Sequence, residues 1–165
     1  MSNQLLARDV MRIGVPTCKP GQPIDRLAAQ MVEHGWTAVV VLDDEGDARG
    51  WINERMMAQG YVRQVALSAG GSPLTAADIM EEHVPQAGAD LPLAAIVQLM
   101  GDLGVDHMFF MHHAGGRSWP ASMLSLRDLV KALAGPEYIR HQGIHAQRLT
   151  PMDLFRQRYG LPGKR

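Results

Sequence analysis

The sequence predicts an α/β (α+β) fold in which one arrangement of strands and helices occurs twice. Residues 7–42 align without a gap to residues 76–111, and 8 of the 36 positions are identical. Strand-like and helix-like segments alternate within each copy, as expected for helices that pack on a small sheet. Hydrophobic residues make up 46% and charged residues 20% of the 165 positions, which is ordinary for a chain that folds around a core.

The repeat includes residues that shape the backbone as well as apolar ones. The segment ARDVM (7–11) recurs as AADIM (76–80). Two prolines and a glycine recur in the same register, at Pro16, Pro23 and Gly35 and again at Pro85, Pro92 and Gly104. Three extra residues near 112–117 shift the register of the second copy, after which Met56 corresponds to Asp128. Such a pattern indicates a duplicated structural unit.

The same elements are predicted in the same order in both copies. A short extended piece (15–18, 84–87) leads to a helix that begins after a proline and ends at a glycine. The apolar residues of these helices follow helical spacing: Ile24, Leu27, Ala28, Met31 and Val32, and Leu93, Ile96, Val97, Met100 and Leu103. Next come strands at 38–42 and 107–111, turns at 43–46 and 112–117, second strands at about 48–52 and 119–124, and helices near 54–66 and 126–134.

These patterns divide the chain into two repeats, a linker and a tail. The first repeat spans 5–67, a Gly/Ser/Pro-rich linker spans 68–74, and the second repeat spans 75–135. The basic tail, 136–165, carries a charge of about +4 and the rest about −5. Thr150 and Pro151 can start a helix that Gly160 ends, so we expect a short tail helix near 151–159, docked on the body or on a second copy.

Bulk properties narrow the classes of protein that the chain can be. The net charge is −1, Cys18 is the only cysteine, and the longest apolar run is only 38–42. The N-terminus shows no signal-peptide pattern. We therefore expect a soluble, cytoplasmic protein with no membrane contact. Nucleic acid is not an expected partner, because the few tail charges would give only weak, salt-sensitive contact.

With its segments in place, the chain resembles a tandem pair of cystathionine-β-synthase (CBS) motifs, a Bateman module, over about residues 5–135. The resemblance lies in the D-h-M entry, the glycine-terminated helix, the apolar strand and the G-h-h-[ST]-x-x-D-h exit, which only SMLSLRDL (122–129) matches well. It implies two β-α-β-β-α units packed about a pseudo-twofold axis, to which the chain adds the helical tail predicted above. It also implies a homodimer, and a regulatory role without catalysis. The ligands would be adenine-containing (AMP, ADP, ATP, or S-adenosylmethionine or NAD), bound between the repeats.

Ser125 and Asp128 are the main candidates for ligand contact. Before an apolar helix, S-x-x-D is also a capping pattern, and both roles can hold together. By the resemblance, Asp128 accepts hydrogen bonds from ribose hydroxyls and Ser125 faces ribose or phosphate. The first repeat has Asn53 and Met56 at these positions. Because a thioether is a poor acceptor, we expect one ligand per chain.

The resemblance places five further residues around the cleft that contains Asp128. They are Trp36 and Thr37 from the first repeat, Asp106 and His107 from the second, and Met11 from the first entry segment. The alternatives are a core aromatic residue for Trp36 and a surface or hydrogen-bonded histidine for His107.

No sequence motif indicates catalysis or a bound metal. The chain has no nucleophile motif, phosphate-binding loop or dinucleotide fingerprint, so we expect no enzyme activity and no required cofactor. The adjacent His112 and His113 lack the spacing of a zinc site. The leading hypothesis is a sensor that changes shape or partner affinity when an adenine nucleotide binds. The alternative is a scaffold that binds no ligand and meets a protein partner through its dimer face and tail.

Overall fold

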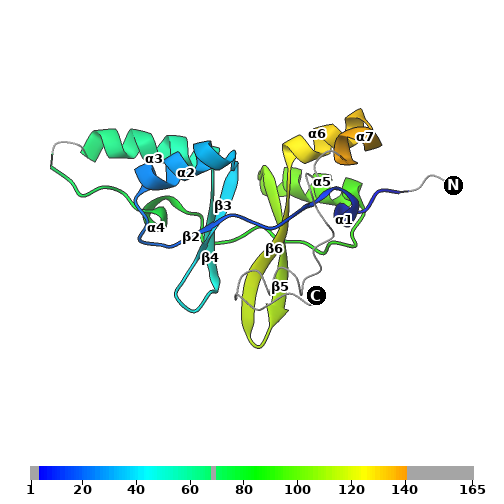
Figure 1. Cartoon of the computed structure of the whole chain (residues 1–165), viewed down its shortest axis with the longest axis horizontal. Helices are drawn as coiled ribbons and strands as arrows, with labels where there is room; N and C mark the ends of the chain where they lie inside the picture. Colours follow the sequence, from blue (N-terminus) through cyan, green and yellow to red (C-terminus); the bar gives the residue numbers. More distant parts are fainter. Residues whose placement is uncertain (1–3, 68–69, 141–165) are drawn as a thin grey trace, which may run out of the picture.

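Two three-stranded sheets with their own helices form the two halves of the molecule (Figure 1). The computed structural model describes residues 4–67 and 70–140. The first half contains β2 (Thr17–Cys18), α2 (Ile24–His34), β3 (Ala38–Leu42), β4 (Ala48–Asn53) and α3 (Glu54–Leu67). The second contains α5 (Leu93–Leu103), β5 (His107–Ala114), β6 (Arg117–Ser125) and α6 (Leu126–Ala134). The predicted fold class and the duplicated unit are confirmed.

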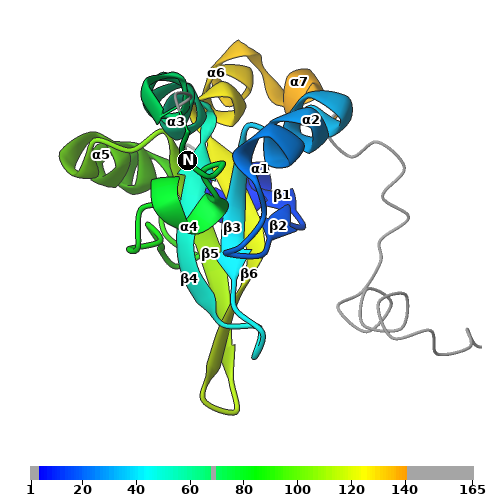
Figure 2. The ribbon, with the colours of Figure 1, turned by 90° about the vertical axis from the view of Figure 1, so that its left-hand side faces the viewer.

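The helices begin and end where the sequence predicts. Pro23 and Pro92 are the N-cap residues of α2 and α5. Gly35 and Gly104 follow the last turns with φ of 64° and 65°, a left-handed conformation that suits glycine. Helices α2, α3 and α6 lie at one end of the strands, and the β5–β6 hairpin projects from the other (Figure 2).

The entry segments of the two repeats are exchanged between the halves. Helix α1 (Ala7–Val10) and β1 (Arg12–Ile13) belong to the first repeat, yet β1 pairs antiparallel with β6 of the second. Helix α4 (Ala76–Ile79) belongs to the second repeat, and the following Glu81 forms a bridge with Trp51 of β4. In Figure 1 α1 lies with α5 and α6, α4 lies near α2 and α3, and the chain crosses between the halves after α1.

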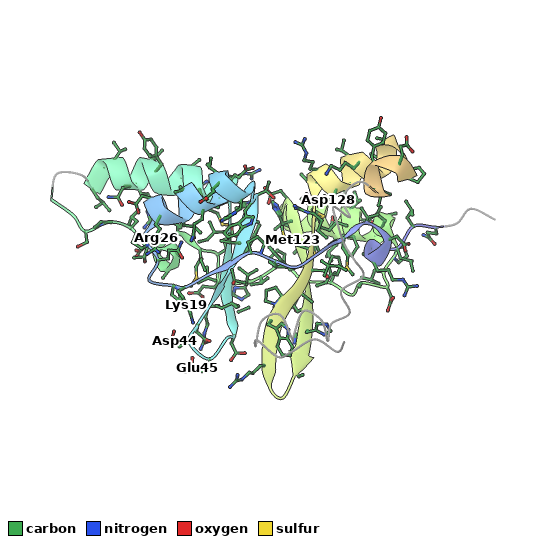
Figure 3. The ribbon with its side chains drawn as sticks, in the orientation of Figure 1. Lys19, Arg26, Asp44, Glu45, Met123 and Asp128 are labelled. Carbon is green, nitrogen blue, oxygen red and sulfur yellow. The ribbon has the colours of Figure 1, made fainter. Side chains whose placement is uncertain are left out.

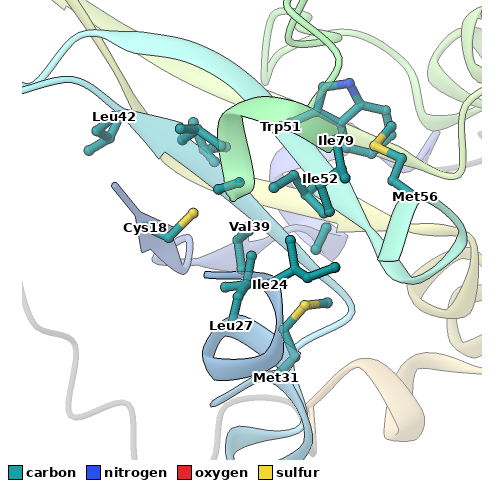
Figure 4. Close-up of a cluster of buried hydrophobic side chains, with 14 of the residues drawn as sticks. Cys18, Ile24, Leu27, Met31, Val39, Leu42, Trp51, Ile52, Met56 and Ile79 are labelled. Atoms are coloured by element: carbon teal, nitrogen blue, oxygen red, sulfur yellow. The ribbon is translucent and has the colours of Figure 1, made fainter. Parts of the chain in front are cut away.

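The hydrophobic cores follow the same exchange. Ala76 and Ile79 of α4 are buried in the core built on the first sheet, where Ile79 lies near Trp51, Ile52 and Met56 (Figure 4). Ala7 and Val10 of α1 are buried in the core built on the second sheet. The first core is therefore completed by α4 of the second repeat, and the second core by α1 of the first repeat.

Several local predictions differ from the structure. The predicted turn at 112–117 is shorter, because β5 continues through His112 and His113 and the chain reverses at Gly115–Gly116, where φ is 59° and 74°. The predicted extended piece at 84–87 forms only one bridge, between Gln86 and Phe109. A short helix, α7 (Pro136–Arg140), follows α6 within the stretch assigned to the tail. The tail helix predicted near 151–159 lies outside the described residues.

The buried stripes of α2 and α5 are narrower than the apolar spacing suggests. Ile24, Leu27 and Met31 are buried in α2, but Val32 is 84% exposed. In α5, Ile96 and Met100 are buried whereas Val97 and Leu103 are exposed. Several apolar side chains therefore face outward on the helical layer. None of the helices in residues 4–67 and 70–140 has the length and apolar character needed to cross a membrane.

Candidate functional site

Asp128 is a buried carboxylate at the start of α6. Its Oδ2 accepts hydrogen bonds from the backbone N–H and the hydroxyl of Ser125, both at 2.8 Å. The Asp128 backbone N–H points back to Ser125 Oγ at 3.4 Å, which completes a capping box. Capping therefore accounts for the spacing of the two residues. Asp128 lies toward the middle of the molecule, near the first half (Figure 3).

A third donor to Asp128 comes from the first repeat. Arg12 Nε lies 3.2 Å from Asp128 Oδ2, and the two side chains are 34% and 2% exposed. The contact exists because β1 pairs with β6, which sets Arg12 opposite Met123. Arg12 was not among the site residues predicted from the sequence. It could have been found from its position directly after Met11, which was expected to approach this cleft.

A cavity of about 200 Å³ lies between the halves beside this ion pair. One wall comes from the first half, with Trp36 and Thr37 at the start of β3, and the other from β1 and β6. Trp36 is half-buried, and its indole stacks on the His34 ring with 4.8 Å between centroids. The lining residues are Arg12, Ile13, Gly14, Pro16, Trp36, Thr37, Ala38 and Met123.

A chain of hydrogen-bonded polar side chains, buried or half-buried, runs from this cavity to the equivalent region of the first repeat. His107 Nε2 lies 2.9 Å from Thr37 Oγ1, and His107 Nδ1 lies 2.9 Å from Asp106 Oδ1. Asn53 Nδ2 donates to the same Asp106 oxygen at 2.8 Å. An ionised carboxylate only accepts, so the Nδ1–H of His107 donates to Asp106, and its Nε2 bonds to the Thr37 hydroxyl.

The charge of Asp106 is maintained by the same hydrogen bonds. Burial raises the pKa of the Asp106 carboxyl, but the bonds from His107 and Asn53 lower it further than burial raises it. Its pKa therefore lies below the usual value, and Asp106 is an anion at neutral pH.

The corresponding cleft of the first repeat is built differently. Asn53 caps α3 as Ser125 caps α6, by accepting from the Met56 N–H at 2.9 Å. Met56 is buried where the second repeat has Asp128. Trp51 pairs with Glu81 as Met123 pairs with Arg12, so a buried indole replaces a thioether and an acid replaces the arginine. Asp106 stands where the other cleft has Thr37.

The predicted site residues fall into three groups in the structure. Trp36 and Thr37 line the cavity, and Ser125 and Asp128 form the buried cap beside Arg12. His107 is buried behind Thr37, while Asp106 lies on the Asn53 side. Met11 is half-buried and packs against the second core rather than lining the cavity.

Cys18 lies in the first core, apart from this cavity. Burial raises the pKa of the Cys18 thiol to about 11, so it is protonated at neutral pH. Within residues 4–67 and 70–140, no three His, Cys, Asp or Glu side chains are placed to hold a metal ion.

Comparison with known proteins identifies the fold of the chain and a family match for its first repeat. Residues 7–61 match the family model of the CBS domain. The structure of the CBS-domain pair of protein MJ0100, in complex with 5′-methylthioadenosine and S-adenosyl-L-methionine, superposes with a TM-score of 0.65 at 16% identity. The match covers 78% of this chain and 99% of that one, so it includes both repeats. The chain therefore has the fold of a CBS-domain pair, and its first repeat matches the CBS family.

Other solved structures share this CBS-pair fold. The CBS-domain protein ATU1752 from Agrobacterium tumefaciens gives a TM-score of 0.68 at 23% identity, over 81% of this chain and 97% of that one. A CBS-domain protein of unknown function, TA0289 from Thermoplasma acidophilum, gives 0.65 at 18% identity, over 84% and 75%. No curated protein sequence matches the chain. The shared fold places the Asp128 cavity between the two CBS repeats.

Proposed function

We propose that the chain is a regulatory module that binds one adenosine-containing ligand in the cavity beside Asp128 and catalyses no reaction. The observation that supports this most is a buried carboxylate next to a cavity walled by Trp36 and Thr37. A carboxylate accepts hydrogen bonds from a ribose diol, and an indole provides a surface on which an adenine ring can stack. Binding between the repeats would shift their packing, and with it affinity for a partner. The single buried thiol and the absence of a disulfide agree with a cytoplasmic setting.

One ligand per chain is expected, because the first cleft lacks the features of the second. Met56 replaces the carboxylate, and Trp51 fills the place that Met123 has beside the cavity. Asp106 adds an acidic group beside Asn53, and Glu81 stands at the position equivalent to Arg12, so this region disfavours an anionic ligand.

Calorimetric titration of the full chain, freed of small molecules, with AMP, ADP, ATP, S-adenosylmethionine and NAD tests this proposal. Asp128→Asn keeps the shape of the cap but removes its charge, so binding should weaken at least tenfold, as expected for a lost charged hydrogen-bond acceptor. Asp102→Asn is the matched control, since Asp102 is an exposed acid on α5. Failure of all five compounds to bind the native chain would reject the proposal.

The alternative function, a scaffold that acts through its helical face, rests on a different observation. Apolar side chains are exposed on α3 and α6, which lie at the same end of the strands (Figure 1). They are Tyr61, Val62 and Val65 on α3, and Leu126, Val130 and Leu133 on α6. A scaffold without a ligand would melt at the same temperature with and without nucleotide, whereas a ligand that binds only the folded state raises the melting temperature.

We also propose that this helical face pairs two copies of the chain into a homodimer, because exposed apolar patches of this kind mark association surfaces. Sedimentation at micromolar concentration should show a dimer, and Leu133→Glu, a residue that is 87% exposed, should shift it toward monomer. Gln98→Glu, on the exposed face of α5, serves as the control for added charge. A native chain that is entirely monomeric would contradict this.

A further inference from the structure

Arg12 is the one charged residue among those that line the cavity in the described part of the chain. It uses Nε to contact Asp128, and its two terminal nitrogens make no hydrogen bond to any described residue. A guanidinium has five N–H donors, so four of them are available to a group in the cavity.

Arg12 also competes with a ligand for Asp128. Asp128 Oδ2 already accepts from the Ser125 N–H, the Ser125 hydroxyl and Arg12 Nε. A ribose diol that bonds to both carboxylate oxygens must therefore displace Arg12 from Oδ2. A guanidinium that loses its carboxylate partner in a half-buried position needs another anion.

The size of the cavity gives Arg12 a second role. Its volume of about 200 Å³ is smaller than the roughly 300–1,000 Å³ of pockets that hold small-molecule ligands. Arg12 lies on the wall between the cavity and the buried carboxylate. Movement of its side chain away from Asp128 would enlarge the cavity and uncover the carboxylate in one step.

We propose that Arg12 determines ligand specificity by exchanging Asp128 for a phosphate, which selects phosphorylated adenosines over neutral or cationic ones. This rests on the proposed function and adds the chemical class of ligand. A phosphate offers the guanidinium a two-point, charge-assisted contact in place of the one-point contact at 3.2 Å. Adenosine offers no such replacement, and S-adenosylmethionine carries a cationic sulfonium where AMP carries its phosphate, with its carboxylate farther out.

The first cleft provides a comparison within the same chain. At the position that corresponds to Arg12, it carries Glu81, whose backbone makes the same type of bridge to the neighbouring strand. The two repeats thus differ in the sign of the side-chain charge at one pair of equivalent residues, Arg12 and Glu81. Under the proposal, this difference directs a phosphorylated ligand to the second cleft alone.

The test compares AMP with adenosine and S-adenosylmethionine by titration calorimetry on the full chain. Native protein should bind AMP about 10- to 100-fold more tightly than adenosine, the range expected for hydrogen bonds to a charged group. In Arg12→Gln the preference should fall to within about threefold, while adenosine binds as well as before or better, because Asp128 has lost its internal partner. Arg12→Lys should keep part of the preference, since the charge remains but the two-point contact does not.

Arg127→Gln is the matched control, because it removes an exposed arginine next to Asp128 that does not line the cavity. It should leave the ratio of AMP to adenosine affinity unchanged. Equal binding of AMP and adenosine by native protein, or a preference that survives Arg12→Gln, would overturn the role of Arg12. If adenosine binds and Asp128→Asn abolishes that binding, the proposed function stands even then. If neither compound binds native protein, both proposals fail.

Discussion

At the scale of single residues, burial decides what the polar groups of this molecule can do. Asp128 is 2% exposed, so its negative charge requires the three donors that meet it. Two of these come from Ser125, the N-cap residue three positions earlier, and the S-x-x-D pattern predicts them. The third comes from Arg12, which is 116 residues away in sequence. Sequence spacing could not predict that contact, because it depends on β1 pairing with β6.

Cys18 should be inert in the folded protein. Its side chain is buried, and burial raises the pKa of the thiol to about 11, above the value of about 8.5 in an unfolded chain. At pH 8 a thiol-reactive disulfide reagent should label native protein much more slowly than protein in urea, where the thiolate fraction is larger. Rapid, complete labelling of native protein would show that Cys18 is accessible.

Asp106 should make folding stability depend on pH in acid. The pKa of its carboxyl is lower in the folded state, so its stabilisation is present above the unfolded value of about 3.9 and is lost as pH falls through the folded value. Urea unfolding should show native protein losing stability in this window more steeply than Asp106→Asn. Asp102→Asn, at an exposed position, should follow native protein. Parallel curves for native protein and Asp106→Asn would contradict the expectation.

At the scale of elements, β4 and the segment that follows α4 approach each other closely along the backbone. Gly50 lies where a Cβ atom would be 2.5 Å from the carbonyl oxygen of Glu81 and 2.9 Å from the sulfur of Met80. The bridge between Trp51 and Glu81 requires this approach. The entry segment of the second repeat therefore depends on a glycine in the first.

Gly50→Ala should destabilise the protein by about 1–3 kcal/mol, because a backbone oxygen cannot move aside as a flexible side chain can. Gly101→Ala is the control: Gly101 is in α5 and a Cβ there meets nothing within 4 Å. That change should be neutral or stabilising by up to about 1 kcal/mol, since alanine favours helix. Denaturant unfolding of both variants measures the difference. Equal stability of the two variants would show that the segment adjusts to the added methyl group.

Local sequence patterns predicted individual helices and strands well, but they predicted less well which elements pair with one another. The run AVVVL forms β3 as expected, since it is buried on both faces. His112 and His113 extend β5, although they are polar and exposed, because they pair with Trp119 and Ser118 across the hairpin. The candidate site shows the same contrast between local patterns and contacts that are distant in sequence. The resemblance to CBS motifs indicated Trp36, Thr37 and Asp128, but Arg12 and Met123 reach the cavity only through strand pairing between repeats.

At the scale of the whole molecule, the exchanged entry segments join the two repeats into one folding unit. Val10 and Ile79 occupy equivalent positions in the two copies and are 4% and 9% exposed. Each is buried in the core of the opposite half. The same exchange brings Arg12 to Asp128, so the fold that couples the two halves also builds the candidate site.

Val10→Ala should therefore weaken the second half, and Ile79→Ala should weaken the first half. The loss of buried methyl groups costs about 2 kcal/mol for Val10→Ala and about 2–5 kcal/mol for Ile79→Ala. Local opening follows the weakened core, so amide hydrogen exchange should rise most in β5, β6 and α6 for Val10→Ala and in β3 and β4 for Ile79→Ala. Exchange that rises mainly within the mutated repeat would mean that each repeat is stabilised by its own entry segment. The reciprocal pattern is expected because the exchanged helices are buried in the opposite cores.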